Sequence, residues 1–270
     1  MLVRAVPGVY SRLFGAGFRR QWNYRAAMFA GLAANVVFGL IRGAVMLAAV
    51  RSAPEFGGYT SGSIGAYVWL SQGMLGALRL MGPPPDIAER VRTGDVAVDL
   101  QRPIDIQSFY LATDLGTATC TLVLRGLPCA AAGLLTGQFV LGGGIAPYLL
   151  GIVSVFAAVT LSMLLLFSVG LLGFWLIETR GVRLLYQIVS TFFAGLFFPV
   201  HMFPEPLASI ARLTPFPWML QGPIDILSGR VTGVSALGVI AVQVIWIGLA
   251  AGIGRLLLAA GRRKLEVQGG

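Results

Sequence analysis

The sequence predicts an all-α, polytopic membrane protein with six transmembrane helices. Hydrophobic residues make up 56% of the 270-residue chain and charged residues only 11%, about half the charged share of a soluble domain. Six apolar segments have roughly the 20 residues that a membrane-spanning helix needs. Lipid offers the backbone no hydrogen-bond partners, so these segments are expected to be helices. The predicted spans, within one membrane domain over residues 26–270, are residues 26–50, 63–82, 107–135, 147–177, 184–203 and 232–260.

A separate element, residues 1–25, precedes the first span. Apolar side chains such as Tyr10 and Phe14 recur there at helical spacing, and basic ones such as Arg12 lie on the other side. This pattern predicts a basic amphipathic helix over residues 3–20 that is too short and too polar to cross a bilayer. We expect it to lie in the membrane interface.

The loop after the second span is predicted to contain a short helix at residues 86–93. Asp86 can cap the amino terminus while Glu89 reaches back to complete a capping box, and Gly94 can supply the left-handed residue that ends the helix. Ile87 and Val91 lie one turn apart and form an apolar ridge. The charged side chains around that ridge are Glu89, Arg90 and Arg92.

The segment before the last span is dense in proline, which excludes a continuous helix. Its prolines are Pro199, Pro204, Pro206, Pro215, Pro217 and Pro223. We expect a re-entrant outer hairpin at residues 204–230, with one short helix at 207–213 and a broken one at 219–227. Because the segment is apolar, it is expected to dip into the membrane, where irregular backbone needs protein or water around it.

Basic residues cluster on one side of the predicted topology. The net charge is +9, and 15 basic residues fall before the first span, after the second and fourth spans, and after the last. Only Arg51, Arg212 and Arg230 fall in the opposite loops. The positive-inside rule therefore places both termini in the cytoplasm, and this distribution explains the basic character better than nucleic-acid binding does.

Three charged residues, Arg42, Asp114 and Arg125, fall inside predicted spans. Asp114 and Arg125 share one helix face, but an axial gap of about 16 Å prevents them from pairing. Each is expected either to pair across a helix or subunit interface, or to line a substrate path. Trp175 is similarly expected to contact an amphipathic substrate or to serve as a packing anchor.

Motifs for chemistry within the chain are missing. Its single lysine, Lys264, is not part of a Gly-x-x-x-x-Gly-Lys-Ser/Thr phosphate loop, so nucleotide hydrolysis of that kind is excluded. The single histidine, His201, offers no catalytic or metal-binding set. An intramembrane enzyme is therefore disfavoured. An ion-coupled secondary transporter that works without an ATPase stays open, with Asp114 as its only intramembrane acidic candidate.

The order of elements resembles the type-2 class of ATP-binding-cassette exporter permeases over essentially the whole chain. The class has a loop pattern of a glycine, an acid, a leucine and an Arg/Lys-Pro pair, and the loop IAERVRTGDVAVDLQRP is similar to it. The stretch before the last span in that class is resembled by the run LFFPVHMFPEPLASIARLTPFPWMLQGPIDILSG. One bacterial subgroup has an ending that resembles RRKLEVQGG. The matching loop residues are Gly94, Asp95, Leu100, Arg102 and Pro103. Permeases of that subgroup sit beside a sister permease and a separate ATPase.

The resemblance implies a non-enzymatic permease subunit in a bacterial plasma membrane. The helix at residues 86–93 would be a coupling helix, its Ile87/Val91 ridge would seat in a groove of the ATPase, and Arg90 and Arg92 would meet acidic groups there. The chain itself would hold no cofactor, since ATP and Mg²⁺ would be bound by the ATPase. Two permease halves would export a drug, natural product or lipid, and the resemblance favours a heterodimer over a homodimer of two copies of this chain. An excess of arginine over acid in the spans argues against a cationic cargo.

Overall fold

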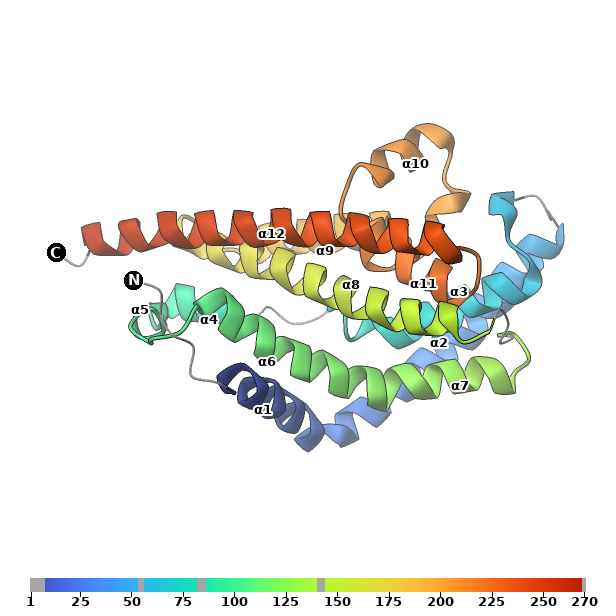
Figure 1. Ribbon diagram of the computed structural model, residues 1–270, viewed down its shortest axis with the longest axis horizontal. Coiled ribbons are helices and arrows are strands. Elements are labelled where there is room, and N and C mark those ends of the chain that lie inside the picture. Colours follow the sequence, from blue (N-terminus) through green and yellow to red (C-terminus); the bar gives the residue numbers. More distant parts are fainter. Residues whose placement is uncertain (1–7, 53–55, 82–85, 140–143, 269–270) are drawn as a thin grey trace.

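The computed structural model describes residues 8–52, 56–81, 86–139 and 144–268, and all regular elements among them are helical (Figure 1). The longer helices are α1 (Val9–Asn23), α2 (Arg25–Ser52), α3 (Ser61–Leu75), α6 (Ile106–Thr121), α7 (Leu127–Leu135), α8 (Ala146–Leu171), α9 (Arg180–Phe193) and α12 (Gly233–Gln268). The short elements are η1 (Phe56–Gly58), α4 (Asp86–Thr93), α5 (Val96–Leu100), η2 (Leu122–Gly126), η3 (Leu172–Phe174), η4 (Val200–Met202), α10 (Glu205–Arg212), η5 (Pro217–Met219) and α11 (Gln221–Leu227).

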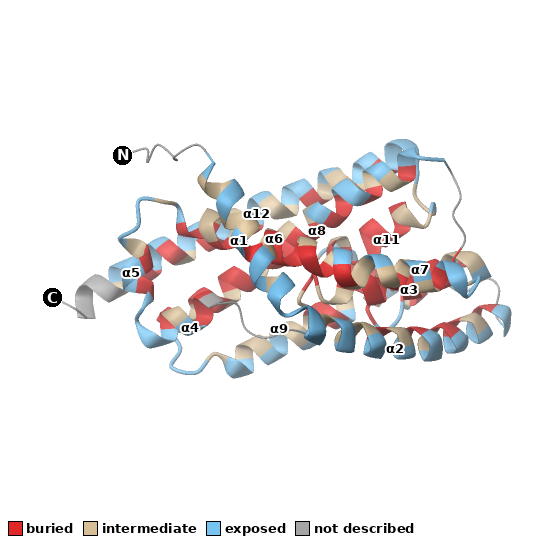
Figure 2. Cartoon of the chain, turned by 90° about the horizontal axis from the view of Figure 1, so that it is seen from below, coloured by how far each residue is buried: buried red, intermediate tan, exposed pale blue. Residues whose placement is uncertain are grey.

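The long helices run along the long axis of the molecule and separate its two ends. In Figures 1 and 2, α4, α5 and the carboxyl end of α12 lie at one end, and α3, α7 and α11 lie toward the other. Polar loop elements and the outer hairpin therefore occupy opposite ends of the bundle.

Among the residues that the structure describes, four helical segments are long and apolar enough to cross a membrane. They are Arg25–Ser52, Ile106–Leu135, Ala146–Phe174 and Gly233–Lys264, and they correspond to the first, third, fourth and sixth predicted spans. The other two predicted spans contain α3 and α9, which have 15 and 14 residues and fall short of the roughly 20 that a straight span needs. The count of six spans stays a prediction.

The second predicted span, residues 63–82, is helical only as far as Leu75, where α3 ends and a turn follows. The turn is nevertheless buried: Leu78 and Leu80 are 0% and 1% exposed. The Oγ of Ser162 donates to the carbonyl of Leu78, and Thr191 Oγ1 donates to that of Leu80 at 3.3 Å. Non-helical backbone is tolerated at this depth because neighbouring helices satisfy its carbonyl groups.

The fifth predicted span, residues 184–203, is shifted and shortened. Its helix α9 begins at Arg180 and ends at Phe193, and Gly195 then adopts a left-handed conformation with a φ of 86°. Tyr67 Oη donates to the Gly195 carbonyl at 2.7 Å, so this turn is fixed against α3. The left-handed residue stops the helix before the proline-rich segment begins.

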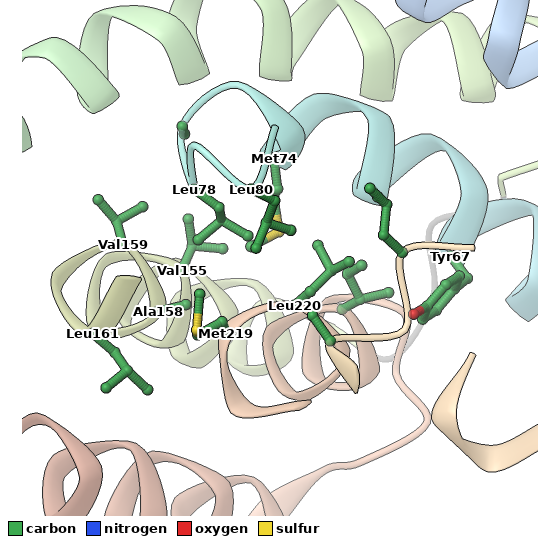
Figure 3. Close-up of a cluster of buried hydrophobic side chains, with 14 of the residues drawn as sticks. Tyr67, Met74, Leu78, Leu80, Val155, Ala158, Val159, Leu161, Met219 and Leu220 are labelled. Atoms are coloured by element: carbon green, nitrogen blue, oxygen red, sulfur yellow. The ribbon is translucent and has the colours of Figure 1, made fainter. Parts of the chain in front are cut away.

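The proline-rich segment forms short helices and no continuous one, as predicted. The helix expected at residues 207–213 is α10, and the broken one expected at 219–227 is η5 followed by α11. Its second half is enclosed by protein: Met219, Leu220 and Ile224 are all 0% exposed, and Figure 3 shows Met219 and Leu220 facing Val155 and Leu80 in the main hydrophobic core.

One span is interrupted by a π-helix, η2, that the sequence prediction missed. Pro128 lies just after it, at the start of α7. Proline lacks the N–H that would bond to the carbonyl four residues earlier and clashes with that carbonyl. The chain adjusts by one wider turn, in which the N–H of Leu127 donates to the carbonyl of Leu122. The proline within the predicted span, residues 107–135, was the feature of the sequence that could have indicated this interruption.

The amino-terminal helix α1 begins at Val9, and the first part of the predicted helix over residues 3–20 lies outside the described residues. It packs along α6 at backbone contact distance. A Cβ added at Gly17 would lie 2.0 Å from the carbonyl oxygen of Thr113, and one added at Gly116 would lie 2.0 Å from that of Phe14. Only glycine permits this approach, so α1 is anchored on the first half of the third span.

Candidate functional site

The candidate site is the loop between α3 and α6, which folds into two short helices at one end of the bundle. Helix α4 spans Asp86–Thr93, the residues predicted for it, and α5 spans Val96–Leu100. Gly94 ends α4 with a φ of 82°, as predicted, and its N–H donates to the Val91 carbonyl. The side chain of Asp86, and with it the expected capping box, lies outside the described residues.

The apolar ridge of α4 faces the chain's own core, which corrects the expectation that it would seat in an ATPase groove. Ile87 is 0% and Val91 8% exposed. They pack in a cluster with residues of α6, α8 and α12, among them Tyr110, Leu171 and Leu258. A buried apolar ridge is already covered, so it cannot serve as a free docking surface.

Asp99 organises the two short helices and was missed by the sequence analysis. Its carboxylate is 4% exposed and accepts hydrogen bonds from Nε and Nη2 of Arg90, the latter at 3.0 Å, and from the Tyr110 hydroxyl at 3.1 Å. Arg102 approaches the same carboxylate at 3.4 Å. The bond to Asp99 raises the pKa of Arg90 above its ordinary value, and Arg90 Nη2 also donates to the Asp95 carbonyl at 3.1 Å.

The exposed surface at this end, here called the tip surface, comprises the residues of α4 and α5 that face away from the core. Its members are Glu89, Arg92, Thr93, Gly94, Asp95, Ala97 and Val98. Glu89 and Arg92 form an exposed ion pair on adjacent turns, and the Thr93 hydroxyl donates to Asp95 at 3.0 Å. Val98 is 56% exposed, which leaves an apolar side chain beside charged ones.

The remaining predicted loop residues take different places. Leu100 is half-buried against the α4 cluster. Arg102 is exposed and lies over the Phe109 ring at 5.4 Å from its centroid, and Pro103 is exposed beside it. Trp175 lies in the turn after η3, which contacts α4, and is 41% exposed. Trp175 therefore belongs to this end of the molecule, one residue beyond the candidate membrane-spanning segment Ala146–Phe174.

Asp114 pairs with a cation from another element. Its carboxylate lies 3.0 Å from Nη2 of Arg79, and the two side chains are 14% and 13% exposed. Arg79 comes from the buried turn after α3, where it adopts a positive φ of 49°. This ion pair ties that turn to α6 and gives Asp114 a structural partner across a helix interface.

The two arginines inside spans bond across the interface of α2 with its neighbours. Arg125 Nη2 donates to Asn35 Oδ1 at 2.9 Å, and Asn35 in turn donates to the Gln72 carbonyl at 2.8 Å. Arg42 Nη1 donates to Ser71 Oγ at 3.0 Å. The Nε and Nη2 atoms of Arg42 are buried without a hydrogen-bond partner among the described residues. Asn35 is a polar residue in an apolar segment, and this feature of the sequence could have indicated a buried polar contact here.

A second polar network holds the outer hairpin at the opposite end. The carboxylate of Asp225 in α11 is 6% exposed, lies 2.8 Å from His201 Nε2 and accepts a 2.8 Å hydrogen bond from Gln221 Nε2. Arg230 approaches it at 3.5 Å and stacks its guanidinium 3.8 Å over the Tyr59 ring. His201 thus has a structural partner that the sequence alone did not indicate.

Comparison with known proteins gives one match. Residues 39–269 match the family described as ABC-2 family transporter protein, a stretch that runs from the middle of α2 through α12 and contains the tip surface. Searches of curated proteins and of solved structures found no match. Because the family match extends over most of the sequence, the chain belongs to the ABC-2 family of membrane transporters.

Proposed function

We propose that this chain is the permease subunit of an ATP-driven exporter whose ATPase is a separate polypeptide. The observation that supports it is the construction of α4 and α5. One side is built into the ends of three long helices, and the other presents a charged, partly apolar surface that nothing in the described chain covers. A docking element needs both a rigid support and a free face.

Force on the tip surface would reach the spans through the buried ridge. Val91 is so close to η3 that a Cβ at Gly173 would lie 3.0 Å from its Cγ1, and Ile87 shares its cluster with Tyr110 of α6 and Leu258 of α12. Packed interiors transmit displacement because they resist compression. Closure of an ATPase dimer against the tip surface would therefore move α6, α8 and α12 together.

The assignment of contacts to the ATPase changes accordingly. In this proposal Glu89, Arg92 and Asp95 would meet charged groups of the partner, and Val98 would enter an apolar depression. Ile87, Val91 and Arg90 act as internal supports. ATP and Mg²⁺ would be held by the ATPase. In the proposed mechanism this chain supplies neither ligands for the nucleotide nor a catalytic group.

The proposed complex lies in a bacterial plasma membrane, with the tip surface and both termini in the cytoplasm, as the positive-inside rule indicates. It contains two permease halves, a sister permease being favoured over a second copy by the resemblance of the terminal RRKLEVQGG. The cargo is a hydrophobic or amphipathic small molecule moved outward. The buried Nε and Nη2 of Arg42, which have no hydrogen-bond partner in the part of the chain that the structure describes, suit a position at the path or the interface between halves.

An ion-coupled carrier working alone is the second candidate. It would need an intramembrane carboxylate free to exchange protons. Asp114 is the acidic candidate within the described spans, and it lies 3.0 Å from Nη2 of Arg79, which gives it a structural partner. This geometry weighs against a proton relay through Asp114.

Val98→Asp tests the proposal, with Val98→Thr as the matched control that keeps the shape of the side chain. Since Val98 is exposed, both variants should insert and fold like the wild type. In the purified complex, Val98→Asp should abolish cargo-stimulated ATPase activity and weaken ATPase retention, and Val98→Thr should not. Wild-type stimulation by Val98→Asp at equal expression contradicts the assigned surface.

A further inference from the structure

A cavity of about 390 Å³ lies inside the membrane-embedded part, away from the tip surface. It is bounded by α3, α6, η2, α7, α8 and α11, and its inner wall includes Met74, Val155 and Leu227. Cavities of this size accommodate small organic ligands. The outer hairpin contributes Leu227, so an occupant would touch the element that closes the opposite end of the bundle.

The cavity arises from small residues beside the π-helix. The backbones of α3 and η2 approach closely at Gly73 and Gly126, where a Cβ at Gly73 would lie 3.0 Å from the Cα of Gly126. Ala130, one turn further on, also leaves the space unfilled. The hydroxyl of Thr119, a polar group in the lining, already bonds to the Leu115 carbonyl at 2.7 Å. Water would find few partners here, so the cavity suits an apolar occupant.

The cavity opens onto the exposed apolar surface of the long helices. Its rim includes Val123, Leu127 and Ile152, which are 42%, 66% and 53% exposed, and these residues belong to two of the four segments able to cross a membrane. An occupant can therefore enter sideways from hydrocarbon without passing through water.

The cavity is elongated along the helices. Its lining along α8 runs from Tyr148, near the start of that helix, to Phe156, a rise of about 12 Å. On the facing span the lining runs from Leu134 to Thr119, a rise of about 22 Å. Half of a hydrocarbon core measures about 15 Å. A slot that begins where α7 ends and α8 begins, and that runs inward over a comparable length, suits a single hydrocarbon chain whose polar end stays at the interface.

We propose that this cavity binds one acyl chain of a membrane phospholipid from the leaflet at the α7–α8 end. The lipid chain fills the space between η2 and α8 and contacts Leu227 of the outer hairpin and Met74 of α3. Lipid occupancy thereby supports the position of α11. The proposal is independent of the identity of the ATPase and of the cargo.

Photolabelling of the full-length protein in its purified complex tests the proposal. The complex is placed in vesicles of phosphatidylcholine that carries a diazirine midway along one acyl chain. Met74 and Val155 are 3% and 8% exposed, so ordinary boundary lipid cannot reach them. Peptide mapping should find adducts there as well as at Phe38, a 64% exposed reference on α2. Labelling of Phe38 without Met74 or Val155 would overturn the proposal.

A cavity-filling pair of variants sharpens the test. Ala130→Phe places a ring in the cavity and should abolish the adducts at Met74 and Val155 while leaving those at Phe38. Ala131→Phe is the matched control, because Ala131 is exposed and outside the lining, and it should keep all adducts. If Ala130→Phe fails to fold, the proposal is tested by the wild-type adducts at Met74 and Val155 and by their reduction in Ala130→Leu. Adducts at Met74 and Val155 that persist in Ala130→Phe contradict a lipid chain bound in the cavity.

Discussion

Replacing Asp99 with Asn is the sharpest test of the support beneath the tip surface. The change keeps the shape of the side chain but removes a buried charge that faces Arg90 and Arg102. Hydrogen bonds to charged groups contribute about 1.5–3 kcal/mol each. The Arg90 side chain is 33% exposed, so water recovers part of the loss, and we discount the net effect to about 2 kcal/mol.

That loss should appear as local opening of α4 and α5. Since 1.4 kcal/mol is a tenfold change in an equilibrium constant, amide hydrogens over residues 86–103 should exchange roughly 30-fold faster in Asp99→Asn than in wild type. Hydrogen exchange read by mass spectrometry measures this directly, with peptides of α12 as internal reference. Asp95→Asn is the control, because Asp95 is exposed and its side chain bonds only to Thr93 among the contacts described. Equal exchange in Asp99→Asn and wild type would refute the support role.

Two further predictions concern the buried polar contacts of the spans. Ser162→Ala leaves the buried carbonyl of Leu78 without its donor and should cost about 1–3 kcal/mol, seen as a lower midpoint in thermal unfolding of the detergent-solubilised protein. Thr160→Ala, whose hydroxyl bonds within its own helix, should cost less than about 0.5 kcal/mol, and equal midpoints for the two variants would contradict the assignment. Asp114→Asn isolates the Arg79 cation and should cost about 3 kcal/mol, whereas adding Arg79→Gln should restore much of it; a double variant no more stable than the single one argues against the ion pair.

Long-range packing decided what the sequence could predict. The apolar runs, Gly94 and the prolines act locally, and they correctly indicated α2, α8, α12, the end of α4 and the broken outer segment. The residues just after Leu75 are mostly apolar, like those of a membrane-spanning helix, so the sequence did not indicate that a turn begins there. That turn exists because Ser162 and Thr191, far along the chain, satisfy its carbonyl groups.

The candidate site was predicted in position but not in orientation. Spacing showed that Ile87 and Val91 share a face and that this face would be covered, but an amphipathic pattern cannot say which partner covers it. Asp99 carried no local signal, because its principal partners lie 9 and 11 residues away at Arg90 and Tyr110. The exposed residues around Val98 became a candidate surface only once the ridge was seen to be internal.

Reconstitution tests the central claim most directly, namely that a separate motor acts on this chain through the tip surface. Purified protein is placed in sealed vesicles alone, or together with the ATPase that co-purifies with it, and transport of an amphipathic fluorescent dye is followed against its gradient. The account predicts no uphill transport by the chain alone with or without an ion gradient, and ATP-dependent transport by the complex that is lost with Val98→Asp. Uphill transport by the chain alone, without any nucleotide-hydrolysing partner, would contradict it.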